Sequence, residues 1–165
     1  MNVNKILIIG ISGTGKTRLA KMLSDILNIP VIHYDELAWG KDWEEVKTEE
    51  VDKKTKEILK KDKWIIEGYI NPTAKEKLDN ADMVIYLDFK GPSAFWGGLQ
   101  RWWQYRGKVR PEMKEGCTEE FNFDYLKTML KRKERVEIEK EIKGFEDKTT
   151  RLKSRKEVDK FIKSF

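Results

Sequence analysis

The chain has 165 residues, a length that suggests one domain able to bury a core without disulfides or a structural metal. Its one cysteine, Cys117, excludes an intrachain disulfide and a zinc site built from cysteines, and its one histidine argues against a histidine-based metal site. The 34 basic and 29 acidic residues give a net charge of +5, which suits a phosphate-rich ligand but is too small to indicate nucleic acid by itself. No stretch approaches the roughly 20 apolar residues of a membrane span, and we identify no signal peptide. We therefore expect a cytoplasmic protein, either a monomer or a homodimer.

Short apolar runs alternate with helical patterns along the chain, which predicts an α/β fold with a parallel sheet. Residues 5–9 contain consecutive isoleucine and leucine side chains, as in a strand that is buried on both faces. Further apolar runs predict strands at residues 31–34, 64–67, 83–89 and 149–152. We therefore expect a five-stranded parallel sheet with helices on both faces.

The segments between these strands carry helical patterns. The stripe in the first helix, at residues 15–27, consists of Leu19, Leu23, Ile26 and Leu27. Ser154 and Glu157 form a capping-box pair ahead of the last helix. The other helices are expected at residues 48–61, 72–78 and 123–142. Residues 91–116 combine three tryptophans with basic side chains, and we predict that they form a short lid within the single domain of residues 1–165.

Residues 10–17 read Gly-Ile-Ser-Gly-Thr-Gly-Lys-Thr, the pattern of a phosphate-binding loop, and they lie between a predicted strand and an amphipathic helix. The glycines let several backbone N–H groups point at one phosphate, and the helix N-terminus adds partial positive charge there. We expect Lys16 to reach the β- and γ-phosphates of ATP and the Thr17 hydroxyl to bind Mg²⁺. The residues expected to bind the nucleotide are Gly10, Ser12, Gly13, Thr14, Gly15, Lys16, Thr17 and Arg18.

Acidic residues stand where three predicted strands end, and ligands of parallel sheets gather at those ends. Asp35 is our candidate for the residue that takes a proton from the acceptor hydroxyl or orients it; the alternative is a turn cap. Glu67 is the candidate that binds Mg²⁺ directly or through water; the alternative is a strand-end residue paired with a lysine. For Asp88 the functional and structural interpretations are equally balanced, and His33 is expected to be a packed residue.

Arg101, Arg106 and Arg110 recur near helical spacing, and arginines on a lid stabilise the charge that develops during phosphoryl transfer. Two alternatives remain open: a solvated basic face with tryptophans beneath it, and a surface that stacks nucleic-acid bases. The basic run from Lys127 to Arg135 alternates with glutamates and is typical of an exposed helix.

Taken with these motifs, the chain resembles the P-loop NTPases of the adenylate-kinase-like small kinase group, and more closely the bacterial family labelled DNA topology modulation protein. The resemblance covers nearly the whole chain and rests on residues 10–17, 30–35 with Trp39, 64–69, 105–113, 115–117 and 152–158. It implies a kinase-like core with a short lid, ATP and Mg²⁺ as cofactors, and a place beside the adenine for Ser154 and Arg155.

We therefore expect an ATP-dependent phosphotransferase with a small-molecule or nucleotide acceptor. The expected catalytic residues are Lys16, Asp35, Arg101, Arg106 and Arg110, and the expected metal ligands are Thr17 and Glu67. The alternatives are a DNA-binding regulator in which ATP is a ligand, as the family label implies, and an NTPase without an acceptor. The sequence shows no helix-turn-helix or other DNA-binding signature.

Overall fold

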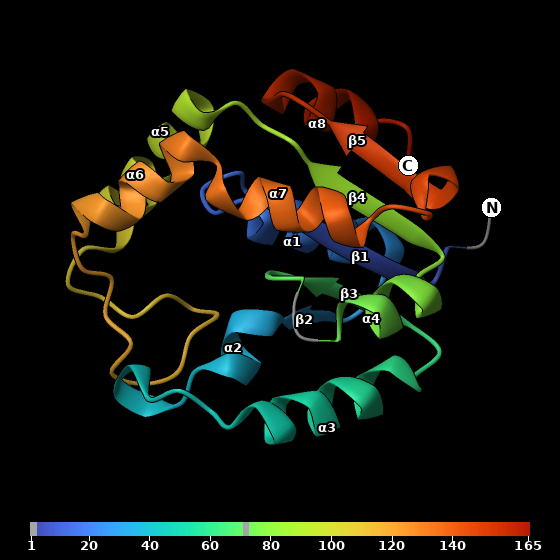
Figure 1. The fold of residues 1–165 in the computed structure, drawn as a ribbon, viewed down its shortest axis with the longest axis horizontal. Helices are drawn as coiled ribbons and strands as arrows, with labels where there is room; N and C mark the ends of the chain where they lie inside the picture. The colour runs from blue at the N-terminus through green and yellow to red at the C-terminus, as the bar shows by residue number, and fades with distance from the viewer. Residues whose placement is uncertain (1–2, 71–72) are drawn as a thin grey trace.

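The computed structural model describes residues 3–70 and 73–165. Its centre is a parallel five-stranded sheet with strand order β2-β3-β1-β4-β5, which confirms the predicted fold class (Figure 1). All five predicted strands are present, with ends that differ from the prediction by two residues at most. The strands are β1 (Lys5–Gly10), β2 (Val31–His33), β3 (Trp64–Glu67), β4 (Met83–Leu87) and β5 (Thr149–Leu152).

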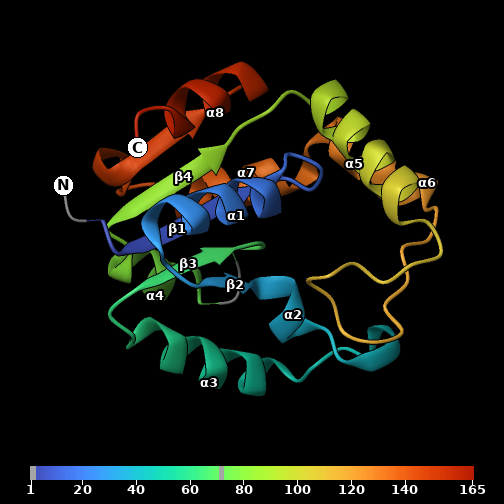
Figure 2. The ribbon, with the colours of Figure 1, turned by 180° about the vertical axis from the view of Figure 1, so that it is seen from behind.

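Helices cover both faces of the sheet, with α1 in front in Figure 2 and α7 in front in Figure 1. No helix among residues 3–70 and 73–165 is long and apolar enough to cross a membrane. The α-helices are α1 (Lys16–Leu27), α2 (Tyr34–Ala38), α3 (Thr48–Leu59), α4 (Ala74–Asn80), α5 (Gly91–Tyr105), α6 (Phe123–Lys131), α7 (Lys133–Glu141) and α8 (Arg155–Ile162), and the 3-10 helices are η1 (Lys41–Trp43) and η2 (Glu146–Lys148).

The central strand β1 supplies side chains to two separate cores, because successive residues of a strand point to opposite faces. Ile6 and Ile8 pack with residues of α1 and α8 on one face. Leu7 and Ile9 pack with residues of α4, α6 and α7 on the other. A strand that is buried on both faces needs the unbroken apolar run that the sequence shows. Its carboxyl end leads directly into the predicted phosphate-binding loop.

The single helix predicted at residues 123–142 is wrong: the chain forms α6 and α7 with a break at Arg132. Arg132 has a left-handed backbone with φ of 50°, which ends the first helix and redirects the second. Its guanidinium bonds the carboxylate of Asp88 at the end of β4. This ion pair stabilises the turn between α6 and α7, which a continuous helix would lack.

Smaller differences concern helix ends and one added helix. The helix predicted at residues 72–78 is α4, and its predicted first residue, Pro72, lies outside the described residues. The five-residue helix α2 follows β2 directly and was not predicted. Ile26 was expected on the buried stripe of α1 but is 46% exposed. The capping box is confirmed, because the Ser154 hydroxyl accepts the backbone N–H of Glu157 at 3.3 Å.

The segment expected to be a lid consists of helix α5 followed by the start of an irregular loop, residues 106–122. The loop reaches η1 at the far side of the molecule (Figure 1), where the Cys117 thiol lies 3.2 Å from the carbonyl oxygen of Gly40. Cys117 is buried and unpaired. The lid role of residues 91–116 remains a prediction.

Candidate active site

The phosphate-binding loop leaves the end of β1 and enters α1, as the motif predicts. Gly13 and Gly15 have φ angles of 80° and 90°, a backbone conformation that favours glycine. The ammonium group of Lys16 folds back over the loop, where Nζ donates to the carbonyl oxygens of Gly10 at 2.9 Å and Ile11 at 3.2 Å. The loop therefore holds its lysine over the site where a triphosphate would bind.

Helix α5 approaches the tip of this loop at backbone distance. A Cβ atom placed on Gly13 would lie 2.1 Å from the carbonyl oxygen of Ala94, and one placed on Gly97 would lie 2.0 Å from the carbonyl oxygen of Gly13. Such contacts require glycine at both positions. The close contact between the loop and α5 thus depends on Gly13 and Gly97, and only Gly13 belongs to the sequence motif.

We expect Gly97→Ala to lower both the melting temperature and the affinity for ATP. In an ordinary helix interior this change stabilises by about 0.5–1 kcal/mol. Here the new methyl group meets backbone atoms that cannot rotate away, so the expected result is a loss of about 1–3 kcal/mol, as in other overpacked sites. Thermal unfolding with and without ATP measures both effects.

Ser93→Ala is the matched control, because Ser93 is an exposed position of the same helix. A Gly97→Ala protein that melts at or above the wild-type temperature and binds ATP normally would contradict the close contact.

Thr17, Glu67 and His33 form one hydrogen-bonded group at the carboxyl ends of β2 and β3. The Thr17 hydroxyl donates to Oε1 of Glu67 at 3.0 Å, and Nδ1 of His33 lies 2.7 Å from the same oxygen. Burial raises the pKa of Glu67, but the hydrogen bond from His33 and the charge of Lys16 outweigh it, so the pKa lies below its ordinary value. Glu67 is therefore an ionised carboxylate whose partner is a histidine rather than a lysine.

This group fits the predicted magnesium site. Mg²⁺ prefers oxygen ligands and usually keeps several waters, with one or two ligands from the protein. The Thr17 hydroxyl and the Glu67 carboxylate supply two such oxygens beside the phosphate-binding loop. Within the described ranges, 3–70 and 73–165, no three histidine, cysteine or carboxylate side chains gather at one metal-binding point.

A cavity of about 270 Å³ lies on one side of the phosphate-binding loop. It is lined by Thr14, Gly15 and Arg18 of the loop and α1, and by Arg155 at the start of α8. Arg155 donates to the side-chain oxygen of Gln100 on α5 at 3.1 Å. Ser154, predicted beside it, is not among the lining residues and caps α8. This cavity brings together residues predicted to bind the nucleotide from both ends of the chain.

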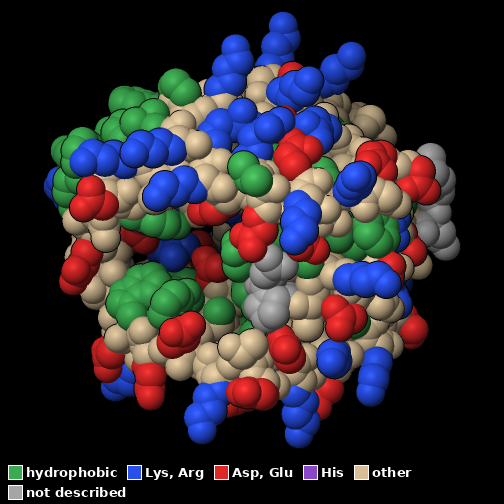
Figure 3. Space-filling view, in the orientation of Figure 1, with side chains coloured by type: hydrophobic (Ala, Val, Ile, Leu, Met, Phe, Trp, Pro, Cys, Tyr) green, Lys and Arg blue, Asp and Glu red, His purple; other side chains and the backbone are tan. Residues whose placement is uncertain are grey.

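A larger cavity of about 710 Å³ lies on the other side of the loop. It touches Gly10, Ser12 and Lys16, and it contains Asp35 on α2, a predicted catalytic residue. Figure 3 shows a hollow between α6 and the α2–η1 segment, with acidic and basic side chains inside and hydrophobic ones along its lower edge. Its volume is typical of a small-molecule site.

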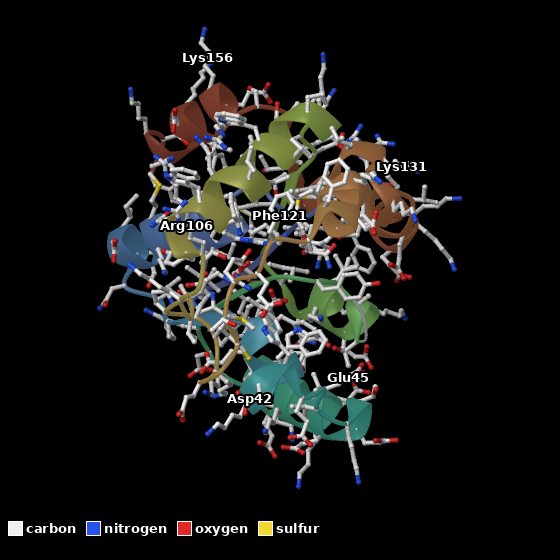
Figure 4. All side chains as sticks on the ribbon, turned by 90° about the vertical axis from the view of Figure 1, so that its left-hand side faces the viewer. Asp42, Glu45, Arg106, Phe121, Lys131 and Lys156 are labelled. Atoms are coloured by element: carbon white, nitrogen blue, oxygen red, sulfur yellow. The ribbon has the colours of Figure 1, made fainter. Side chains whose placement is uncertain are left out.

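The structure brings two of the three predicted lid arginines to this cavity. Arg101 of α5 and Arg110 of the following loop both line it. Arg106 is exposed and lies 4.3 Å over the ring of Trp103, outside both cavities. Figure 4 shows Arg106 on the α5 half of the molecule and Glu45 on the opposite, α2–α3 half.

Asp88 has a structural environment rather than a place in either cavity. Its carboxylate is buried and pairs with three guanidinium groups: Arg132, Arg135 at 3.1 Å and Arg151 at 3.2 Å. Two of these arginines belong to the run that was expected to be solvent-exposed. A buried carboxylate needs such partners, and they join β4 to α7 and β5.

Two residues at the site were not predicted. The carboxylate of Glu134 accepts the backbone N–H of Ser12 at 3.2 Å, and the Tyr125 hydroxyl donates to the Ser12 side chain at 2.6 Å. Glu134 is 122 residues away in the chain and reaches the loop only because the break at Arg132 turns α7 toward it. No local sequence signal marks either contact.

Comparison with known proteins supports the fold. No family model and no curated protein matches the chain. A shikimate kinase from Acinetobacter baumannii, solved in complex with shikimate, is 19% identical with a TM-score of 0.57 over 99% of this chain and 90% of its own. A gluconokinase from Sinorhizobium meliloti 1021 is 12% identical with a TM-score of 0.55 over 97% and 87%. A shikimate kinase from Bacteroides thetaiotaomicron is 14% identical with a TM-score of 0.54 over 96% and 94%. The chain has the fold of the P-loop small kinases.

One wall of the larger cavity rests on a buried lysine. Nζ of Lys77 lies 4.1 Å from the ring centroid of Tyr34 and donates to the carbonyl oxygen of Tyr69 at 3.2 Å, and both tyrosines line the cavity. The Lys77 side chain is fully buried. Burial lowers its pKa to about 7, although the carboxylates of Asp52 and Glu76 act in the opposite direction.

This lysine predicts a pH-dependent stability. Between pH 7 and about 10.5 the unfolded chain keeps the Lys77 proton while the folded protein releases it, so the free energy of unfolding rises with pH in that window. One proton accounts for a slope of about 1.4 kcal/mol per pH unit. Urea unfolding at pH 7, 8 and 9 measures this rise. We expect it in the wild type and in the control Lys75→Met, which changes an exposed residue of α4. We expect no such rise in Lys77→Met. An unchanged slope in Lys77→Met would contradict the assignment.

Proposed function

We propose that this protein is an ATP-dependent phosphotransferase that acts on the hydroxyl group of a small acceptor. The observation that carries the proposal is the pair of cavities that meet at the phosphate-binding loop. One touches Thr14, Gly15 and Arg18, where a nucleotide would lie. The other touches the opposite side of the loop at Ser12 and Lys16, and it has room for a second molecule. An NTPase without an acceptor has no need of that second cavity.

In the proposed reaction, the acceptor hydroxyl oxygen forms a bond to the γ-phosphorus of ATP. The bond from this phosphorus to the β–γ bridging oxygen breaks, ADP leaves, and the hydroxyl proton passes to the carboxylate of Asp35. Lys16 stabilises the negative charge on the transferred group. Arg101 lines both cavities and Arg110 lines the larger one, and in the proposed reaction they exclude water from the transferred group.

Thr17 and Glu67 would hold Mg²⁺, which supplies neutralisation of charge between the β- and γ-phosphates when bound. His33 keeps the Glu67 carboxylate ionised and oriented through its hydrogen bond. Arg155, which lines the smaller cavity, would lie near the adenine, and Ser154 caps the helix that carries it. The arrangement agrees with the P-loop kinase fold.

The test is a screen of nucleosides, nucleotides and small hydroxylated metabolites with ATP and Mg²⁺, in which mass spectrometry detects the phosphorylated product. Formation of a phosphorylated acceptor together with ADP would support the proposal. ADP and free phosphate without any phosphorylated acceptor would overturn it in favour of an NTPase.

The DNA-binding regulator implied by the family label makes a different prediction. It requires tight duplex binding that weakens steeply with salt, because binding releases counterions from phosphates. A titration of duplex DNA at two salt concentrations separates the two functions. Flat, weak binding with active phosphotransfer is the result that we expect.

A further inference from the structure

The two arginines that line the larger cavity are already neutralised by carboxylates. Nε of Arg101 lies 2.8 Å from Oε1 of Glu119, and Nε of Arg110 lies 3.0 Å from Oε2 of the same residue. Nη1 of Arg110 also lies 3.5 Å from Oε1 of Glu112. Glu119 is buried, so water does little to screen these pairs. Glu112 also lies 3.6 Å from the half-exposed ammonium group of Lys21, which does not line the cavity. Within the cavity wall each guanidinium group therefore has a carboxylate partner, which reduces the positive charge that an incoming anion meets.

The remaining charges around the cavity are mostly negative. Its lining contains three basic residues, Lys16 and the two arginines, against five acidic ones, which are Asp35, Glu45, Glu119, Glu120 and Glu134. In the proposed function Lys16 binds the triphosphate, and the arginines are paired with Glu119. Among residues 3–70 and 73–165, Asp35, Glu45 and Glu120 have no ion-pair partner. An anionic acceptor would therefore enter against a negative potential.

Aromatic side chains form the rest of the wall. Trp39 and Trp43 meet edge to face with ring centroids 5.6 Å apart and planes at 78°. Tyr34, Tyr69 and Tyr125 also line the cavity. The faces of aromatic rings attract cations and pack against flat or apolar surfaces, and they do not favour anions. The aromatic walls and the carboxylates thus both favour a cationic or neutral ligand over an anionic one.

We propose that the acceptor is a hydroxyl compound without a negative charge, that hydroxylated amines are preferred, and that Glu119 determines this preference by neutralising Arg101 and Arg110. The inference rests on the proposed phosphotransfer and names the chemical class of its acceptor. A site that binds a carboxylate-bearing acceptor would instead present arginines without carboxylate partners.

Matched acceptor sets test the charge preference directly. Each set has one hydroxylated scaffold as an amine, a neutral alcohol and an acid: glucosamine, glucose and gluconate for a sugar, and hydroxybenzylamine, hydroxybenzyl alcohol and hydroxybenzoate for a ring. Calorimetric titration with Mg²⁺ and a non-hydrolysable ATP analogue measures binding, and mass spectrometry with ATP measures transfer. We expect the amine of at least one set to bind roughly tenfold more tightly than its acid, since a hydrogen bond between charged groups contributes at least that factor. If no amine binds more tightly than its acid, the proposal is overturned.

Variants assign the preference to Glu119. Glu119→Gln removes the carboxylate that faces both guanidinium groups and leaves Arg101 without its partner, so the ratio of amine to acid affinity should fall roughly tenfold or more. An unchanged ratio in a Glu119→Gln protein that still binds the ATP analogue would overturn the role of Glu119. Because Glu119 is buried, the exposed lining residue Glu45 supplies an independent variant: Glu45→Gln should weaken amine binding, while Glu44→Gln, at an exposed neighbour outside the cavity, should leave it unchanged. If Glu45→Gln and Glu44→Gln bind the amine equally well, the proposed contribution of the lining carboxylates is wrong.

The two proposals fail in different ways. The phosphotransferase function fails if the analogue does not bind, or if no compound of any charge becomes phosphorylated. The charge preference fails if the acids bind or react as well as the amines, whatever the rate of transfer.

Discussion

Lys16→Ala is expected to lower phosphoryl transfer by about 10²–10³-fold or more, the effect of removing one preorganised positive group from a phosphoryl-transfer site. The Lys16 ammonium group lies over the loop within hydrogen-bond distance of two loop carbonyl oxygens, and a short movement would bring it to a triphosphate. Alanine leaves the N–H groups of the loop but removes the charge. Titration calorimetry with Mg²⁺ and a non-hydrolysable ATP analogue should therefore show little or no remaining binding.

Lys160→Ala is the control for this loss, because it removes the same charge from an exposed position on α8, away from both cavities. Its affinity for ATP should equal that of the wild type. Wild-type affinity in Lys16→Ala itself would refute the assignment of the loop as the triphosphate site, and the proposed enzymatic function with it.

Asp35→Asn should lower the rate of transfer by about 10²–10⁴-fold while ATP affinity stays near the wild-type value, because the loss of a general base affects only the acceptor side. Asp35 follows β2 on the short helix α2 and lines the larger cavity, whereas the smaller cavity does not include it. Asparagine keeps the shape of the side chain but does not take up the proton. The measurements are kcat for the acceptor, taken from the screen, and calorimetric ATP binding on the same preparation.

Glu36→Gln is the neighbouring control, since the Glu36 carboxylate pairs with Lys114 at 3.1 Å outside the cavity. It should react at the wild-type rate. Full activity in Asp35→Asn would remove Asp35 from catalysis and favour the turn-cap interpretation. Loss of ATP binding together with transfer would instead indicate damage to the phosphate-binding loop.

Lys16 and Asp35 are predicted to act on different molecules, ATP and the acceptor. The sequence predicts this division only in outline. The motif at residues 10–17 indicates where phosphates bind, and strand-end acids indicate where other ligands gather. The structure places Glu67 beside the loop, because β3 pairs with β1 in register, and its role as a magnesium ligand stays a prediction. Its histidine partner was not predicted, because that pairing depends on which strand lies next to β3.

Arg101, Arg106 and Arg110 show more clearly what the sequence does not predict. Their spacing predicted lid arginines that stabilise developing charge, with a solvated basic face or a base-stacking surface as the alternatives. In the structure two of them belong to a network with Glu119, and the third stacks on Trp103. Glu119 follows Arg101 by 18 residues and Arg110 by nine, at positions where no helical or strand period relates them. The loop 106–122 brings them together through contacts with η1, such as that of Cys117.

The sequence by itself determined the strands, the phosphate-binding loop and the helix that follows it, because these features depend on residues close together in the chain: an unbroken apolar run, glycines at fixed positions and a capping box. Only the tertiary structure decided the charge of the larger cavity, the break at Arg132, and the contact of Glu134 with Ser12. Each of these depends on a charged side chain finding a partner far away in sequence. A charge that is left unpaired in the interior costs too much free energy to remain there, so the fold selects the partner, and local patterns carry no record of that choice.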